Sequence, residues 1–188
     1  MRALFVVCLV SVSACGVAAP TTDAGCSNGV KSPPNLMING GFECGGAAPA
    51  EWMGVNGSLS FVTTGASEGS RAAKVTSDAS GTGGVGSTTA VVPKTSGKTY
   101  CINAKVKGTA ADVRLEVFGS LLTSFGSPLS SPDVWVRLPP TTNLEIREPA
   151  DQALFVKVRA QGGAAGDTVI VDDIDLWESP SGKCDQQR

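Results

Sequence analysis

The chain has 188 residues, enough for one domain of ordinary size with short appendages. Its 23 glycines and 11 prolines favour a turn-rich all-β protein over a helical one. A formal net charge of −2 without any Lys or Arg cluster argues against a nucleic acid partner, and the lack of histidine removes the commonest general base and metal ligand.

Residues 1–14 are predicted to be a signal peptide of the lipoprotein type. Arg2 precedes an apolar run over residues 4–12 that is too short to span a bilayer. The stretch Val-Ser-Ala-Cys ending at Cys15 matches the bacterial lipobox, in which Cys15 becomes the lipidated first residue. Because Gly16 follows, we expect an exported, outer-membrane lipid-anchored protein. An ordinary signal peptide with an incidental Cys15, and hence plain secretion, is the alternative.

Residues 15–34 are small, polar and Pro-containing, and we interpret them as the lipidated N-terminus and a tether to the membrane. We expect the folded domain to cover residues 35–179 and residues 180–188 to form a C-terminal tail.

The cysteines divide among these segments. Once Cys8 leaves with the signal peptide and Cys15 takes the lipid, an even number remains for an oxidising compartment: Cys26, Cys44, Cys101 and Cys184. We therefore expect two disulfides. Three connectivities are possible. Because Cys26 and Cys184 flank the domain, we favour Cys26–Cys184 with Cys44–Cys101.

The domain opens with residues 35–43, NLMINGGFE, a strand-like segment that passes two glycines and ends at Glu43. Beyond it, apolar and polar residues alternate with a period of two, as in half-buried antiparallel strands. The clearest candidates are residues 98–108, 112–118, 134–138 and 153–160, with shorter ones at 59–63, 72–76, 85–92 and 144–147. Roughly nine or ten short strands between Gly/Ser/Pro turns predict an all-β fold, a two-sheet antiparallel β-sandwich or jelly roll.

Two short motifs lack the context that their chemistry requires. Residues 81–86 satisfy G-x-G-x-x-G, but a strand-like segment follows, so we predict a hairpin loop. Residues 65–69 satisfy G-x-S-x-G, but Ser67 has no histidine to activate it. The scattered acids, Glu116 among them, lie mostly in loops or on outward faces and form no persuasive pair for glycoside cleavage.

The last predicted strand, residues 168–178, carries an anomaly. Strict alternation puts Asp172 on one face with Ile170, Ile174 and Leu176, and puts Asp173, Asp175 and Trp177 on the other. A carboxylate among large aliphatic side chains needs a partner. It could bind a metal ion, it could pair with a Lys or Arg, or a β-bulge at residues 172–173 could turn it outward.

The opening NLMINGGFE, Trp52, the stretches SRAAKVTS, TYCINAKVKG and WVRL, and the closing VIVDDIDLWE resemble the CenC-like carbohydrate-binding modules of the galactose-binding-like jelly-roll superfamily. The resemblance covers residues 35–178. It implies one structural Ca²⁺ that steadies the fold and does no chemistry. The ligands it implies are Glu43, Asp172 and backbone carbonyls around Ser70 and Arg71.

Sugar-binding sites usually need exposed aromatic faces, and this chain has one Tyr and three Trp. Tyr100 lies on an apolar face and is predicted to be in the core, and Trp52 matches a Trp that is often structural in the family. Trp135 and Trp177 alternate outward, so they are the candidate carbohydrate-binding residues.

We therefore expect a non-catalytic cell-envelope lipoprotein that binds a polysaccharide or cell-surface glycan. The alternative is a protein-interaction or adhesion module on the same sandwich, which the shortage of aromatic residues favours. An enzyme such as a glycosidase or lyase fragment is the third hypothesis, and the missing histidine and unpaired acids argue against it.

Overall fold

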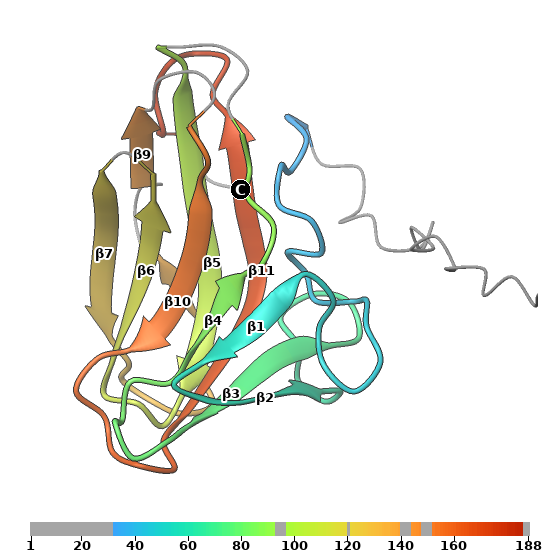
Figure 1. Cartoon of the computed structure of the whole chain (residues 1–188), viewed down its shortest axis with the longest axis vertical. Coiled ribbons are helices and arrows are strands. Elements are labelled where there is room, and N and C mark those ends of the chain that lie inside the picture. Colours follow the sequence, from blue (N-terminus) through green and yellow to red (C-terminus); the bar gives the residue numbers. More distant parts are fainter. Residues whose placement is uncertain (1–31, 93–96, 120, 140–143, 148–151, 186–188) are drawn as a thin grey trace, which may run out of the picture.

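The computed structural model describes residues 32–92, 97–119, 121–139, 144–147 and 152–185. Two antiparallel sheets pack face to face as a jelly-roll sandwich, which confirms the predicted fold class (Figure 1). Within the described ranges, no helix is long and apolar enough to cross a bilayer.

The five-stranded sheet has the order β1-β4-β10-β6-β7. Its strands are β1 (Trp52–Val55), β4 (Gly84–Ser87), β10 (Phe155–Ala160), β6 (Asp112–Phe118) and β7 (Leu122–Pro128). The six-stranded sheet has the order β2-β3-β11-β5-β8, and β9 also pairs with β5. Its strands are β2 (Gly57–Val62), β3 (Ala72–Ser77), β11 (Thr168–Glu178), β5 (Thr99–Gly108), β8 (Val136–Leu138) and β9 (Leu144–Arg147).

The core lies between the sheets and follows the period of two that the sequence shows. Alternate residues of β5, β6 and β10 point inward and are buried: Tyr100, Ile102, Ala104, Val106, Val113, Leu115, Val117, Val156 and Val158. The prediction that Tyr100 is a core residue is therefore confirmed. Trp52 is also buried, with its ring centroid 5.1 Å from that of Phe42, so it has the structural role expected of it.

Strand β11 does not alternate strictly, and here the prediction was wrong. Its register against β5 shifts between Asp172 and Asp175, and Asp173 has a φ of 50°. This bulge brings Ile174 into the core with Val169 and Val171, although their spacing in the sequence has opposite parity. Asp172 consequently shares the outward side with Ile170, as the bulge alternative proposed.

The first segment of the domain runs beside this last strand (Figure 1). Because β3 pairs only with Thr168–Val171, the rest of that β11 edge is left for residues 35–40. Leu36 donates its N–H to the carbonyl of Leu176 at 2.6 Å, and Ile174 donates to Gly40 at 2.9 Å. The ends of the domain therefore meet as expected, although residues 38–41 form a turn and not a strand.

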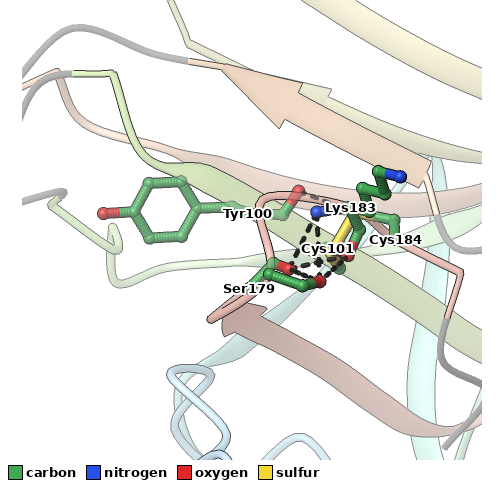
Figure 2. The surroundings of a disulfide bond; sticks show 6 residues. Tyr100, Cys101, Ser179, Lys183 and Cys184 are labelled. Carbon is green, nitrogen blue, oxygen red and sulfur yellow. Dashed lines mark hydrogen bonds between the residues drawn. A yellow bond between two sulfur atoms is a disulfide. The ribbon is translucent and has the colours of Figure 1, made fainter.

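The C-terminal tail folds back over the outer side of the six-stranded sheet (Figure 2). A disulfide joins Cys101 to Cys184, so the predicted pairing of Cys26–Cys184 with Cys44–Cys101 is wrong. Cys101 lies opposite Trp177 on neighbouring strands, and both pack against Cys184 of the tail. Cys44 is also disulfide-bonded, as predicted for it. Cys26 and the lipidation residue Cys15 lie outside the described residues.

Candidate functional site

Glu43 holds the loop that joins β2 to β3. Its Oε1 accepts the N–H groups of Ser70 at 2.9 Å and Arg71 at 3.1 Å, and its Oε2 accepts the Ser70 hydroxyl at 2.6 Å. Burial acts to raise the pKa of Glu43, but the bonds from Ser70 and Arg71 outweigh it and leave the pKa below its ordinary value. A Cβ at Gly69 would lie 2.1 Å from Glu43 Oε1, so this approach requires glycine there.

Asp172 holds the same loop from the other side. Its Oδ2 accepts the N–H groups of Ser67 at 2.7 Å and Glu68 at 3.0 Å, and its Oδ1 accepts the N–H of Asp173 at 2.8 Å. Asp172 is fully buried although it lies on the outward side of the sheet, because this loop covers it. Burial raises the pKa of Asp172 to about 6 against these N–H bonds, so the group is mainly ionised at neutral pH.

Lys105 adds a third attachment. It lies opposite Asp172 in the register, and its Nζ is 2.9 Å from Glu68 Oε1 and 3.0 Å from Asp173 Oδ2. The predicted lysine partner therefore exists, but it binds the acid after Asp172. The loop is thus tied to the first segment of the domain by the Glu43 carboxylate, to β11 by the Asp172 carboxylate and to β5 by the Lys105 ammonium group.

This arrangement bears on the calcium ion that the resemblance implies. Five N–H groups and one hydroxyl bind the two carboxylates, which leaves about one lone pair on each. Ca²⁺ takes six to eight oxygen ligands. Ser70 and Arg71 turn N–H groups, and not carbonyl oxygens, toward Glu43. The groups around the two carboxylates therefore do not fit a Ca²⁺ ion, and the ion stays a prediction from the resemblance.

The two tryptophans proposed for sugar binding differ from each other. Trp177 is only 3% exposed and packs under the tail with Cys101 and Cys184, so the prediction that it faces solvent is wrong. Trp135 is half-buried on the outer side of the six-stranded sheet. Its Nε1 donates to the carbonyl of Gly65 at 3.2 Å, and Lys107 Nζ lies 4.7 Å from its ring centroid. Loop and tail therefore occupy much of this side of the molecule.

The opposite side of the sandwich offers a different surface, which we call the β6–β10 face. It consists of the outward side chains of the five-stranded sheet. The strand register arranges them in three rows: Met53, Gly86, Lys157, Glu116 and Ser124; Val55, Gly84, Arg159, Arg114 and Gly126; Phe155, Phe118 and Leu122. The apolar residues Met53, Leu122 and Phe155 are 52%, 58% and 41% exposed.

Glu116 is the centre of an ionic network on this face. Arg159 donates hydrogen bonds to its carboxylate from Nε at 3.1 Å and from Nη2 at 2.8 Å. Lys157 Nζ lies 3.1 Å from the same carboxylate. Burial acts to raise the pKa of Glu116, but the bonds from Arg159 and Lys157 outweigh it and lower the pKa below its ordinary value. Lys157 Nζ also lies 4.5 Å from the ring centroid of Phe118.

The sequence offered no way to find this network. Glu116 alternates outward, and a solvated charge is the default for such a position. Its partners lie about 40 residues later, and only the pairing of β10 with β6 brings them opposite it. The pair Phe118 and Phe155 likewise becomes visible only through this register.

The molecule is thus a two-sheet β-sandwich of the jelly-roll type, with one side covered by a loop and the tail and the other bearing exposed apolar and charged side chains. Solved structures with this fold include carbohydrate-binding modules. TmCBM61, solved in complex with β-1,4-galactotriose, has 21% identity over 77% of this chain and 99% of that chain, with a TM-score of 0.55.

Two further modules are similar at comparable levels. A family 16 carbohydrate-binding module shows 19% identity over 77% of this chain and 100% of that chain, with a TM-score of 0.55. The CBM22-1 xylan-binding domain of Xyn10C from Paenibacillus barcinonensis shows 15% identity over 71% and 88%, with a TM-score of 0.54. At these identities the likeness concerns the fold. No protein-family model and no curated protein matches the chain.

Proposed function

We propose that this protein is a non-catalytic carbohydrate-binding-module-like protein that binds polysaccharide through the β6–β10 face. The observation that carries the proposal is the combination, on one exposed surface, of an aromatic pair with cationic hydrogen-bond donors. The fold similarity to solved carbohydrate-binding modules supports it.

The chemistry of this face suits a sugar chain. A pyranose ring has an apolar C–H face, which packs against aromatic rings such as those of Phe118 and Phe155. Its hydroxyl groups need fixed polar partners. Lys157 offers N–H donors in the adjoining row, and Arg159 and Arg114 offer them one row further along. The binding role proposed for Trp135 is thereby moved to the other sheet, while Trp135 supports the β2–β3 loop.

The carboxylates support a non-catalytic role. A glycosidase needs two carboxyl groups that flank the scissile bond, one of them free to exchange a proton. Glu116 is held by Arg159 and Lys157, and Asp172 is buried under a loop that binds it through N–H groups. Neither is available to a bound sugar.

We also propose that the protein is exported and anchored to the outer membrane through Cys15. The lipobox motif is the argument for the anchor. The disulfide between Cys101 and Cys184 supports an oxidising compartment. Mass spectrometry of the protein from membranes would test this, since an unmodified N-terminus would contradict lipidation. We do not include Ca²⁺ in the proposal, because the donors at Glu43 and Asp172 do not fit it.

Affinity electrophoresis of the mature chain in gels containing single polysaccharides tests glycan binding. We expect at least one polymer to retard the protein, and Phe155→Ala to reduce the retardation because it removes the exposed aromatic ring. Trp135→Ala, on the other sheet, is the matched control and should bind like the wild type. A glycan array without any binding would refute the proposal.

Such a negative result would favour the second candidate, a protein-interaction or adhesion module. The exposed apolar side chains Met53, Leu121, Leu122 and Phe155 are the observation in its favour. Loss of adhesion to a protein-coated surface on Leu122→Ser, with glycan binding absent, would identify it.

A further inference from the structure

We propose that the β6–β10 face recognises a carboxylate-bearing polysaccharide, a polymer that contains uronic acid residues. This inference rests on the proposed function and names the substrate class of the same face. Its basis is Arg114 in the middle of that face, whose Nε has no hydrogen-bond partner among the described residues and whose neighbour in the register is a second arginine, Arg159.

The strand register explains why Arg114 lacks a partner. It lies opposite Arg159 on β10 and opposite Gly126 on β7, so neither neighbouring strand offers it an acceptor side chain. A Cβ built at Gly126 would be 3.3 Å from Arg114 Cγ and 3.4 Å from its Nε. The side chain therefore lies across the glycine, and a larger residue there would displace it.

The position carries an energetic penalty. The Nε of Arg114 is buried without a hydrogen-bond partner, and an unsatisfied buried donor destabilises the fold. Two like charges opposite each other on neighbouring strands also repel. An anion bound on this face would pair with the guanidinium charge of Arg114 and reduce this repulsion.

The charges around Arg114 are not balanced by the protein's own carboxylates in the part of the chain that the structure describes. Three cations of this face, Arg114, Lys157 and Arg159, lie on its outward side with the carboxylate of Glu116, and only the last two bind it. Asp112, at the start of the same strand, makes no ion pair with Arg114. This face therefore carries a positive charge without a partner among the described residues, although the chain as a whole has a net charge of −2.

The neighbouring pair indicates which anion suits the site. Arg159 binds the Glu116 carboxylate through two nitrogens at 2.8–3.1 Å, the forked geometry that guanidinium and carboxylate groups favour. Arg114 offers the same planar group directly opposite Arg159 on the neighbouring strand β6. The rings of Phe118 and Phe155 lie two rows from it. A hexuronic acid carries both a carboxylate and a ring that can pack on an aromatic residue.

The test uses a matched pair of polymers, polygalacturonate and the same polymer with its carboxyl groups reduced to alcohols, measured by calorimetry on the mature chain. We expect the acidic polymer to bind about tenfold more tightly, and the difference to shrink as NaCl is added. Arg114→Gln should abolish the preference, and Arg114→Lys should restore part of it. Lys74→Gln, which removes one positive charge from the other sheet, should leave it intact.

Arg114→Gln should not lower the melting temperature, because it removes an unsatisfied donor, so a binding defect cannot be blamed on unfolding. Equal affinity for both polymers, with Arg114→Gln unchanged, would overturn this inference and leave glycan binding in place. Tighter binding to dextran sulfate than to polygalacturonate would overturn the choice of carboxylate. Absence of binding to every polymer would overturn the inference together with the proposed function.

Discussion

Gly40 lies where the first segment of the domain packs against its last strand. A Cβ at this position would lie 2.2 Å from the carbonyl oxygen of Ile174, the residue whose N–H donates to Gly40. We expect Gly40→Ala to lower the free energy of unfolding by about 2–4 kcal/mol, because the two backbones must separate. Urea denaturation measures the loss.

The next residue provides the control. A Cβ at Gly41 would meet nothing within 4 Å, so Gly41→Ala should change the stability by less than about 0.5 kcal/mol. Equal effects of the two substitutions would show that the close approach of residues 35–40 to β11 does not matter for stability.

The carboxylates of Glu43 and Asp172 give the second prediction at this scale. Glu43→Gln should destabilise the protein by about 1 kcal/mol and Asp172→Asn by about 2 kcal/mol, because each amide turns an N–H group toward N–H donors of the loop. Since these bonds need no ion, EDTA should leave the melting temperatures of all three proteins unchanged. A drop with EDTA that Ca²⁺ reverses, and that the two variants lack, would instead establish the calcium site.

Single residues could be predicted where one strong rule applied. The pattern places Tyr100 in the core, and it is buried. The resemblance associates Glu43 with Ser70 and Arg71, and these residues do touch. Their contact uses N–H groups where the resemblance implies carbonyls, and only backbone conformation decides which end of a peptide faces a carboxylate.

At the scale of elements, the bulge in β11 limited what the sequence could tell. A single extra residue at Asp173 reverses the alternation for the remainder of the strand. Asp172 thereby moves to the outward side, and its burial comes from a loop about 100 residues earlier in the chain. Trp177 does face outward, but the tail covers it, which no periodicity in β11 could reveal.

The tail itself gives the third prediction. The Cys101–Cys184 bond closes a span of 83 residues, so replacing both cysteines with Ala should lower the unfolding free energy by about 2–4 kcal/mol. Loosening the tail should also expose Trp177 and shift its fluorescence to longer wavelength. In a protein that also carries Trp177→Phe, the shift should disappear. A variant with wild-type stability and fluorescence would mean that the tail stays in place without the bond.

At the scale of the whole molecule, the sandwich was predictable and its binding surface was not. Alternation along each strand separates inward from outward residues, and this is enough for the fold class. A surface made of β1, β4, β10, β6 and β7 depends on strand order and register, because neighbours in this sheet come from distant parts of the chain. The candidate sugar-binding residues therefore shifted from tryptophans on one sheet to phenylalanines on the other.

The ionic network at Glu116 predicts how global stability depends on pH. The folded-state pKa of Glu116 lies below the ordinary 4.5, so its contribution is complete above that pH and is lost as the pH falls through the folded value. At neutral pH, Glu116→Gln should lower the unfolding free energy by about 2 kcal/mol, since Arg159 and Lys157 lose a buried partner. When unfolding by guanidinium chloride is measured at a series of pH values, the stability difference between wild type and Glu116→Gln should shrink steadily below pH 4.5.

Asp133→Asn, at an exposed carboxylate, should show no such convergence. A gap between wild type and Glu116→Gln that persists in acid would mean that packing, and not the charge of Glu116, holds β6 and β10 together on this face.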